Sequence, residues 1–218
     1  SCGHEEISYN SCRNRHCPKC QYSRRLAWIS DRMREVLPVK YFHIVFTIPD
    51  ILNPIVLQNK RVLYGILFRA AKETLKEAAA NPRNLGANIG FMAVLHTWGQ
   101  NLLDHPHLHC VVTGGGLSPD GTKWIASRDN FFVAVRILSR LFRGKFLAYI
   151  KTAFNERKLS FHGKLQNYRY REKFNELIGD AYAREWVVYV KKPFSNPKSV
   201  FEYLGRYTHR VAISNSRI

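Results

Sequence analysis

Two histidines separated by one residue form the most informative pair of side chains in the chain. They lie in His107-Leu108-His109-Cys110-Val111-Val112, whose apolar and β-branched residues are typical of a strand. Alternate residues of a strand point to opposite faces, so His107 and His109 share one face while Leu108 and Cys110 face the core. Two neighbouring imidazoles can supply two nitrogens to a divalent cation. An ordinary strand with two outward polar positions is the alternative, and the pair alone does not exclude it.

Two tyrosines about a hundred residues later are the second candidate group. Tyr203 and Tyr207 are four apart in Tyr203-Leu204-Gly205-Arg206-Tyr207, a segment expected to be helical, which places both hydroxyls on one face. Tyrosines at this spacing usually belong to a core or an interface. Here Arg206, His209 and Arg210 surround them, and this positive setting suits a nucleophile that attacks a phosphate.

Four of the five cysteines fall within the first 20 residues. Cys17-Pro18-Lys19-Cys20 is a CxxC knuckle, which lets two thiolates reach one tetrahedral zinc ion. We expect no export signal, which favours metal binding over disulfides, and the sequence shows no βαβ pattern that would favour a redox CxxC. We therefore expect a structural Zn²⁺ held by ligands drawn from Cys2, Cys12, Cys17 and Cys20, with His16 as a further candidate.

The start of the chain also indicates a fragment. Cys2 followed by Gly3 looks like the second half of another knuckle, whose first cysteine would precede residue 1. A strand is also expected to begin at about residue 211, close to the end of the chain at Ile218. Residues are therefore expected to be missing at both ends.

The segments HPHLHCVVTGGG and YLGRYTHRVAISNSR resemble the metal and nucleophile motifs of the HUH endonucleases, specifically the two-tyrosine rolling-circle transposases of the insertion sequence 91 family. The resemblance extends through nearly the whole chain, including the cysteine-rich start. It implies that His107 and His109 hold a catalytic Mg²⁺ or Mn²⁺. It further implies that Tyr203 and Tyr207 cleave and rejoin single-stranded DNA through a covalent 5′-phosphotyrosine intermediate.

A third metal ligand is expected near the end of the preceding strand. The short connector between that strand and the histidine strand predicts an antiparallel hairpin, which brings its end beside His107 and His109. His96, Gln100 and Asp104 are the candidates, and His96 is preferred because it lies on the strand. A buried structural histidine is the alternative for His96. No catalytic role is expected for His43 or His162.

The pattern of apolar residues predicts an α+β fold: a central antiparallel sheet of about five strands with helices packed on it, as in the HUH palm, preceded by a small zinc-binding module. The expected domains are a zinc-binding, DNA-contacting module at 1–37 and a nuclease domain at 38–218. His105 precedes Pro106 and is expected to lie outside the histidine strand. Strands are expected at 40–49, 90–98, 107–112, 122–126 and 186–190, the third ended by the run Gly114-Gly115-Gly116 and the fifth by Pro193. Helices are expected at 54–80, 131–158, 168–183 and 198–207.

The charge of the chain favours a nucleic-acid partner. It has 34 Lys+Arg against 16 Asp+Glu, a formal net charge of +18, and no apolar run of membrane-spanning length. We expect it to act in the cytoplasm, associated with the nucleoid, on single-stranded or hairpin ends of a DNA element. The sequence does not indicate an oligomeric state. Residues expected to contact DNA are Arg13, Arg15, Lys19, Arg24, Arg25, Arg206 and Arg210.

A basic helical block in the second half offers a further surface for single-stranded DNA, by charge and by stacking on nearby rings. Helices with solvated outer faces are the alternative. Its basic residues are Arg136, Arg140, Arg143, Lys145 and Lys151, and its rings are Phe161, Tyr168 and Tyr170.

Two other functions fit parts of the pattern. A plasmid replication initiator or relaxase of the HUH class shares the metal and tyrosine groups. A non-catalytic zinc-containing DNA-binding protein would keep the cysteines and use His107-Leu108-His109 merely as a strand. A binding protein needs only zinc, whereas the nuclease also needs Mg²⁺ or Mn²⁺.

Overall fold

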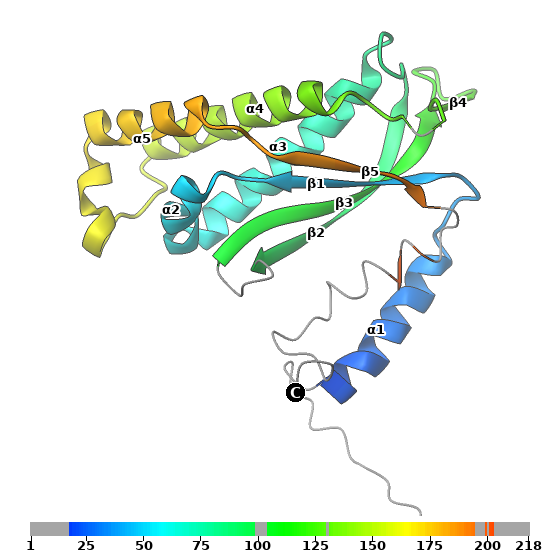
Figure 1. Cartoon of the computed structure of the whole chain (residues 1–218), viewed down its shortest axis with the longest axis horizontal. Helices are drawn as coiled ribbons and strands as arrows, with labels where there is room; N and C mark the ends of the chain where they lie inside the picture. The colour runs from blue at the N-terminus through cyan, green and yellow to red at the C-terminus, as the bar shows by residue number, and fades with distance from the viewer. Residues whose placement is uncertain (1–17, 99–103, 130, 195–198, 200, 203–218) are drawn as a thin grey trace, which may run out of the picture. The chain divides into compact units, whose positions relative to one another are not determined.

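The structure is a computed structural model that describes residues 18–98, 104–129, 131–194, 199 and 201–202 (Figure 1). The chain divides into two compact units: residues 37–200 form one, and residues 1–36 with 201–218 form the other. Within the described residues, none of the helices combines the length and the apolar character needed to cross a bilayer.

A five-stranded antiparallel sheet forms the centre of the 37–200 unit, as the sequence predicts. The strand order is β2-β3-β1-β5, with β4 pairing to β3 outside this path, so β2 and β5 are edges. β2 and β3 are antiparallel neighbours, which confirms the expected hairpin pairing. The strands are β1 (Tyr41–Thr47), β2 (Asn88–Trp98), β3 (Asp104–Leu117), β4 (Trp124–Ala126) and β5 (Val188–Phe194).

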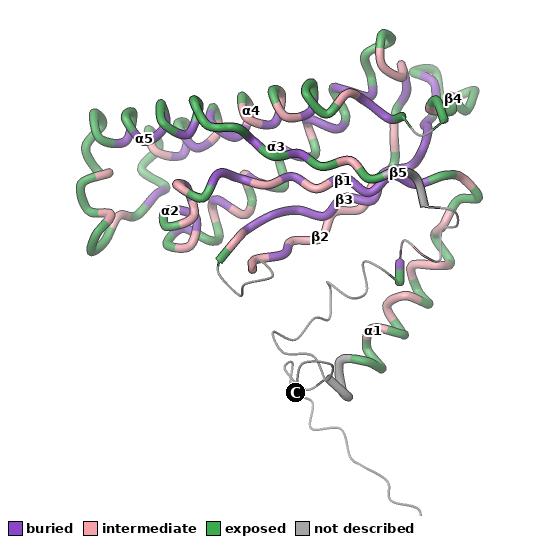
Figure 2. Tube along the Cα trace, in the orientation of Figure 1, coloured by how far each residue is buried: buried purple, intermediate pink, exposed green. Residues whose placement is uncertain are grey.

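One face of the sheet is buried under helices. Alternation along the strands directs Phe42, Ile44 and Phe46 of β1 and Leu108 and Cys110 of β3 into this core, all at 0% exposure. Figure 2 shows the burial running along the central strands and the inner sides of the helices. The helices of this unit are η1 (Asp50–Leu52), α2 (Asn53–Gln58), α3 (Lys60–Ala80), α4 (Val135–Asn155), η2 (Gly163–Arg169) and α5 (Arg171–Ala183).

The helix expected at 54–80 is divided in two by Asn59. This buried residue lies between α2 and α3, and its Nδ2 donates to the carbonyls of Ile55 and Ser160 at 3.1 and 3.0 Å. Its Oδ1 accepts from the backbone N–H of Ser160 at 2.7 Å. The side chain thus links the helical layer to a loop about a hundred residues away. Both polar atoms of this buried side chain are hydrogen-bonded.

Three expectations about the strands are wrong. β3 continues through the glycine run to Leu117, because Gly115 and Gly116 pair with Ala126 and Ile125 of β4. His105 lies within β3, where the pairing with β2 shifts between His96 and Trp98 and such an irregularity accommodates the following proline. β5 runs past Pro193 to Phe194, which an edge strand permits because one side of its backbone needs no sheet partner.

The described part of the other unit is α1 (Pro18–Met33) with residues 34–36, 201 and 202. The rings of Trp28 and Phe201 lie 6.2 Å apart, so a residue at the far end of the sequence packs on this helix. Arg25 lies 5.0 Å from the ring of Tyr22 on the same helix.

Candidate metal centre

Three histidines meet on the face of the sheet opposite the helices. The pairing of β2 with β3 places His96 directly across from His107, and strand alternation puts His109 on the same side. One ring nitrogen from each lies within 4.8 Å of the others, and His96 Nδ1 is 3.1 Å from His107 Nε2. All three are buried. The structure therefore brings together the three histidines that the sequence indicates.

A backbone carbonyl fixes the orientation of His107. Its Nδ1–H donates to the carbonyl oxygen of His105 at 2.5 Å, which leaves the Nε2 lone pair to face His96. An imidazole whose second nitrogen is held in this way is pre-oriented as a metal ligand. The placement of His105 inside β3 is thus part of the site.

Burial favours the neutral form of two of these imidazoles. It lowers the pKa of His107, and it lowers the pKa of His109 to about 2, assisted by the neighbouring histidines His107, His43 and His96. Neutral imidazole is the form that binds metal, so two of the three nitrogens are available near pH 7 without loss of a proton.

The donor set fits a divalent ion. Two nitrogens about 2.1 Å from one ion can be at most about 4.2 Å apart; His96 and His107 meet this limit at 3.1 Å, and the full set of nitrogens lies within 4.8 Å. Imidazole binds first-row transition ions better than it binds Mg²⁺. Of the two catalytic ions expected from the sequence, these residues therefore suit Mn²⁺ better.

His43 is a fourth member of the cluster that the sequence analysis missed. Its Nε2 is 2.9 Å from His109 Nδ1, and the two ring planes are parallel within 2°. It is 2% exposed, and burial with the nearby Lys191 lowers its pKa to about 4. The available signal was the alternation in β1: Phe42, Ile44 and Phe46 face the core, so His43 must face the histidine side.

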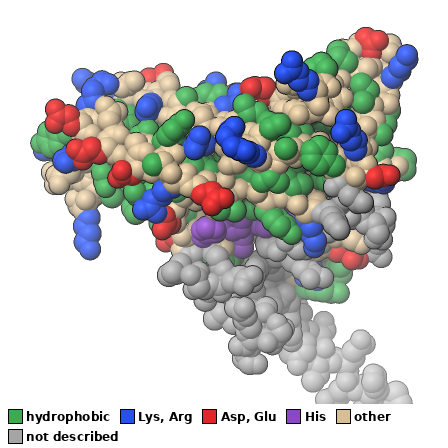
Figure 3. Space-filling view, turned by 45° about the horizontal axis from the view of Figure 1, so that its top comes forward, with side chains coloured by type: hydrophobic (Ala, Val, Ile, Leu, Met, Phe, Trp, Pro, Cys, Tyr) green, Lys and Arg blue, Asp and Glu red, His purple; other side chains and the backbone are tan. Residues whose placement is uncertain are grey.

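A hollow of about 370 Å³ adjoins the histidines, and Thr47, His105 and Val187 are among the residues that line it. Thr47 pairs with His107 across β1 and β3, so the hollow borders the site. Figure 3 shows histidine side chains, in purple, gathered at the lower edge of the coloured surface.

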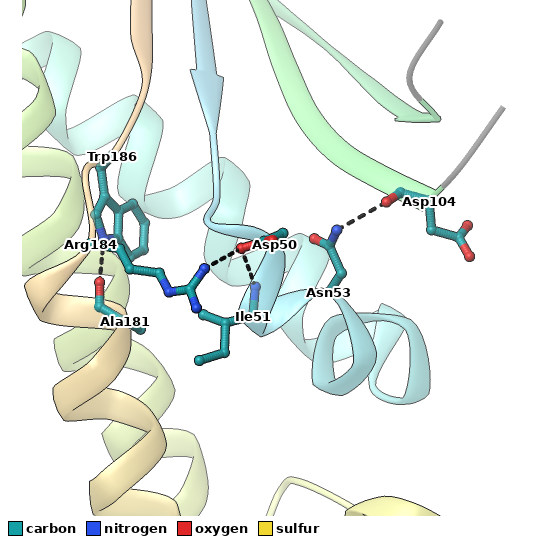
Figure 4. A network of polar contacts seen from close by, with 7 residues as sticks. All are labelled: Asp50, Ile51, Asn53, Asp104, Ala181, Arg184 and Trp186. Carbon is teal, nitrogen blue, oxygen red and sulfur yellow. Dashed lines mark hydrogen bonds and ion pairs between the residues drawn. The ribbon is translucent and has the colours of Figure 1, made fainter. Parts of the chain in front are cut away.

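Polar contacts hold the edge of this hollow (Figure 4). Asp50 accepts from Arg184 and from the backbone N–H of Ile51, both at 2.8 Å. Asn53 Nδ2 donates to the carbonyl of Asp104 at 2.9 Å and so ties the start of α2 to the start of β3. The strand that carries two of the histidines is therefore anchored beside the site.

Several sequence candidates are not part of this cluster. Asp104 is exposed at the start of β3, and Arg24 and Arg25 lie on α1 of the other unit. Lys19 and Cys20 belong to α1, but the description covers only their backbone. The remaining candidates lie outside the described residues: Cys2, Cys12, Arg13, Arg15, His16, Cys17, Gln100, Tyr203, Tyr207, Arg206 and Arg210.

Two families match the chain. The family described as "Putative transposase" matches residues 90–218, and the family described as "Transposase zinc-binding domain" matches residues 1–48. The first match contains β3 with its histidines and also both tyrosines, while the second contains all four clustered cysteines.

Two curated proteins are similar over the whole chain. The "Putative transposase y4qJ" of Sinorhizobium fredii is 56% identical over 217 residues, which is 100% of this chain and 54% of that protein. The transposase for insertion sequence element IS801 of Pseudomonas savastanoi pv. phaseolicola is 31% identical over 218 residues, 100% of this chain and 51% of that protein. The chain thus spans about half the length of these relatives.

Among solved structures, the conjugative relaxase TrwC in complex with oriT DNA, in its metal-bound form, is similar at a TM-score of 0.43. The identity is 14%, and the similarity covers 80% of this chain and 73% of that one.

Proposed function

Because the chain belongs to the insertion sequence 91 family of transposases, with their N-terminal zinc-binding domain, we propose that it cuts and rejoins single-stranded DNA at the ends of a mobile element. The observation that carries the proposal is the cluster of His96, His107 and His109, three buried nitrogen donors within 4.8 Å on one sheet face. Single-stranded or hairpin ends of the element are the proposed substrates.

The histidines orient a scissile phosphate. A divalent ion held by their nitrogens would supply positive charge to the non-bridging oxygens of that phosphate. His107 holds its nitrogen in place through the His105 carbonyl, and His109 does so through His43. The neutral imidazoles bring no charge of their own, so the phosphate meets the full charge of the ion.

Tyr203 and Tyr207 are the proposed nucleophiles. The phenolic oxygen of one attacks phosphorus, the bond to the 3′-oxygen breaks, and that oxygen leaves with a proton as a 3′-hydroxyl. The 5′-phosphate is then joined to the tyrosine, and attack by the 3′-hydroxyl of another strand reverses the step. Two tyrosines allow two such links to be held or exchanged during rolling-circle transposition.

The cysteine-rich start is proposed to hold a structural Zn²⁺ and to contact DNA. Cys2, Cys12, Cys17 and Cys20 are the proposed ligands, with His16 as an alternative, and the match to a transposase zinc-binding domain supports this. The nearby basic residues Arg13, Arg15, Lys19, Arg24 and Arg25 would bind phosphates, and Arg206 and Arg210 would do the same beside the tyrosines.

The test is formation of a protein–DNA adduct that survives denaturant, after incubation of a single-stranded oligonucleotide carrying an element end with Mn²⁺. The parent chain should form it, and the double variant Tyr203→Phe/Tyr207→Phe should not, while Tyr170→Phe at an exposed tyrosine serves as the control. Replacing His107 or His109 by Ala should reduce adduct formation by about 10²-fold or more with DNA binding nearly intact. His162→Ala, at an exposed histidine outside the cluster, should have no effect.

The result also separates the proposal from a non-catalytic DNA-binding protein. Such a protein would bind the oligonucleotide, form no adduct and respond to none of the histidine variants. A DNA-linked peptide that lacks residues 203–207 would leave the nuclease assignment standing but would remove the tyrosines from it.

A further inference from the structure

A second hollow lies next to the one beside the histidines. It has a volume of about 540 Å³ and is formed where α4 passes the segment that leads into β5. Glu185 and Val187 line both hollows. We call the two hollows together the arginine groove, after Arg136, Arg140 and Arg143, which line the second one.

These three arginines follow one another along one face of α4. Their spacing of four and three residues puts consecutive Cα atoms about 6 Å and about 4.5 Å apart along the helix axis. Arg136 and Arg140 are exposed. Figure 3 shows Lys and Arg side chains on the same face of the molecule as the visible histidines. A row of cations of this kind suits a linear polyanion better than it suits a single anion.

Arg143 is held in place at the inner end of the row. Its Nη1 donates to the carbonyl of Tyr182 at 3.2 Å, and its guanidinium lies 4.2 Å from the centre of the Tyr182 ring. The ring itself is 56% exposed. A guanidinium fixed on an aromatic face is pre-organised, so it loses less conformational entropy when it binds a phosphate.

Backbone pairing links the groove to the strands that carry the metal centre. The backbone N–H of Thr47 donates to the carbonyl of Val187 at 3.1 Å, and Thr47 is the β1 partner of His107. The path therefore runs from His107 past Thr47 to Val187 on the edge of the sheet, and from there to α4. All of these residues belong to the 37–200 unit.

Exposed apolar surface accompanies the positive charge. Val187, just before the edge strand β5, and Tyr189, within it, are each 55% exposed. Val135 is 42% exposed at the start of α4. Tyr189 pairs with Val45, which pairs with His109, so its ring is on the histidine face of the sheet. Rings beside a basic groove are the features that bind unpaired bases, whereas paired bases do not present their faces for stacking.

We propose that the arginine groove binds the sugar–phosphate backbone of the single DNA strand that continues from the scissile phosphate. The strand would leave the histidines at Thr47, cross the edge of the sheet at Val187 and follow the arginines along α4. The inference rests on the proposed function, because it needs a DNA strand whose scissile phosphate is at the metal centre.

Two acidic side chains line this path, of which Asp50 is paired with Arg184 at 2.8 Å. Glu185 is exposed and lines both hollows, so a strand in the groove must pass its carboxylate. Like charges close together weaken binding. Glu185→Gln should therefore bind single-stranded DNA more tightly than the parent chain. A gain of affinity on removing a single carboxylate is a result that a general loss of folding cannot mimic.

The test measures binding of a fluorescein-labelled oligothymidine of 20 nucleotides by anisotropy at several salt concentrations. The groove variant Arg136→Gln/Arg140→Gln/Arg143→Gln loses three positive charges. The matched control Arg61→Gln/Lys72→Gln/Lys76→Gln loses the same charge from exposed positions of α3 that line neither hollow. Loss of three phosphate contacts reduces the log–log salt slope by about 2 on a single strand. If both proteins bind alike at 1 M salt, the groove variant binds about 100-fold more weakly at 0.1 M.

Arg143 also packs on Tyr182, so its loss can affect folding. The pair Arg136→Gln/Arg140→Gln, compared with Lys72→Gln/Lys76→Gln, avoids this residue and should reduce the slope by about 1.4. Thermal unfolding and Co²⁺ binding should be unchanged in both pairs.

The outcomes separate the two hypotheses. A loss confined to the groove variants, with tighter binding by Glu185→Gln, supports the groove. Equal losses in groove and control variants overturn it while DNA binding by the chain stands. A parent chain that binds no oligothymidine and forms no adduct with an element-end oligonucleotide overturns the proposed function itself.

Discussion

His43 illustrates how one buried side chain can act on a metal through another. Its Nε2 faces His109 Nδ1 at 2.9 Å. If His109 donates this hydrogen bond, its Nε2 lone pair is directed towards the ion, and the parallel rings keep that direction fixed. We therefore expect His43 to position His109 in the proposed site.

Replacing His43 by Phe keeps a ring of similar width but removes the acceptor for His109. Metal affinity should fall by about 10- to 100-fold, and the absorption spectrum of bound Co²⁺ should change because the ligand geometry is released. His43→Gln, which keeps a polar acceptor, should restore part of the affinity. His162→Phe is the control, and equal Co²⁺ affinity in all four proteins would exclude this role.

The two tyrosines should not be equivalent. Tyr203 and Tyr207 are about one helical turn apart in the expected helix, so both can face the metal at different distances. The single Tyr→Phe variants should differ, one losing first-strand cleavage and the other mainly strand transfer. We expect Tyr207→Phe to lose first cleavage, because Arg206, His209 and Arg210 are adjacent to it. Peptide mapping of the adduct from each variant identifies the residue, and identical behaviour of the two would contradict the prediction.

The sequence was sufficient to nominate His96, His107 and His109, because strand alternation and a short hairpin determine which side chains meet. It was not sufficient for His43, whose partner is 66 residues away in the chain. A contact of that kind depends on which strands become neighbours, and here β1 is inserted between β3 and β5. The face that His43 occupies was predictable from its own strand, but its neighbour was not.

At the level of elements, local sequence rules failed to predict where two strands end, because pairing within the sheet determines those ends. Glycine and proline weaken an isolated strand, so Gly114-Gly115-Gly116 and Pro193 were expected to end their strands. In the sheet, β4 supplies partners for the glycines, and β5 tolerates Pro193 at an edge. The glycines also have a steric reason: a Cβ at Gly116 would lie 2.3 Å from the carbonyl oxygen of Asn88.

Gly116→Ala should consequently destabilise the fold, although alanine is the smallest possible addition. The clash is with backbone of β2, which cannot move as a flexible side chain can, so the free energy of unfolding should fall by more than about 1 kcal/mol. Gly144→Ala is the matched control, since its Cβ on exposed α4 would meet nothing within 4 Å. That change should raise the free energy of unfolding by about 0.5–1 kcal/mol. Denaturant titration measures both, and the same sign for both would contradict the explanation.

For the molecule as a whole, a net charge of +18 should dominate the binding of DNA. Neutralising roughly six phosphates gives a log–log salt slope of about −4 on a single strand. Titrations of a single-stranded oligonucleotide at several salt concentrations measure this slope. A flat dependence would mean that charge is not what holds the DNA.

Removing zinc should affect the two compact units differently. A chelator is expected to loosen the cysteine-rich start and leave the sheet of the 37–200 unit folded, because that unit has its own apolar core. Limited proteolysis should then cut within the first forty residues only. Elemental analysis of freshly purified protein that finds no zinc would rule out the structural ion.

The glycines of β3 affect what happens when the strand pairs in the wrong register. A shift of β3 by one residue against its neighbours would turn Leu108 and Cys110 outward and His107 and His109 into the core. A shift in one direction would also place Leu117 against the carbonyl oxygen of Asn88, where only glycine fits, whereas the opposite shift would bring Gly115 there. Mispaired molecules would therefore expose apolar side chains and lack the histidine site, so they would aggregate and be inactive. Removing the aggregates from a preparation should leave molecules in which the site is correctly formed.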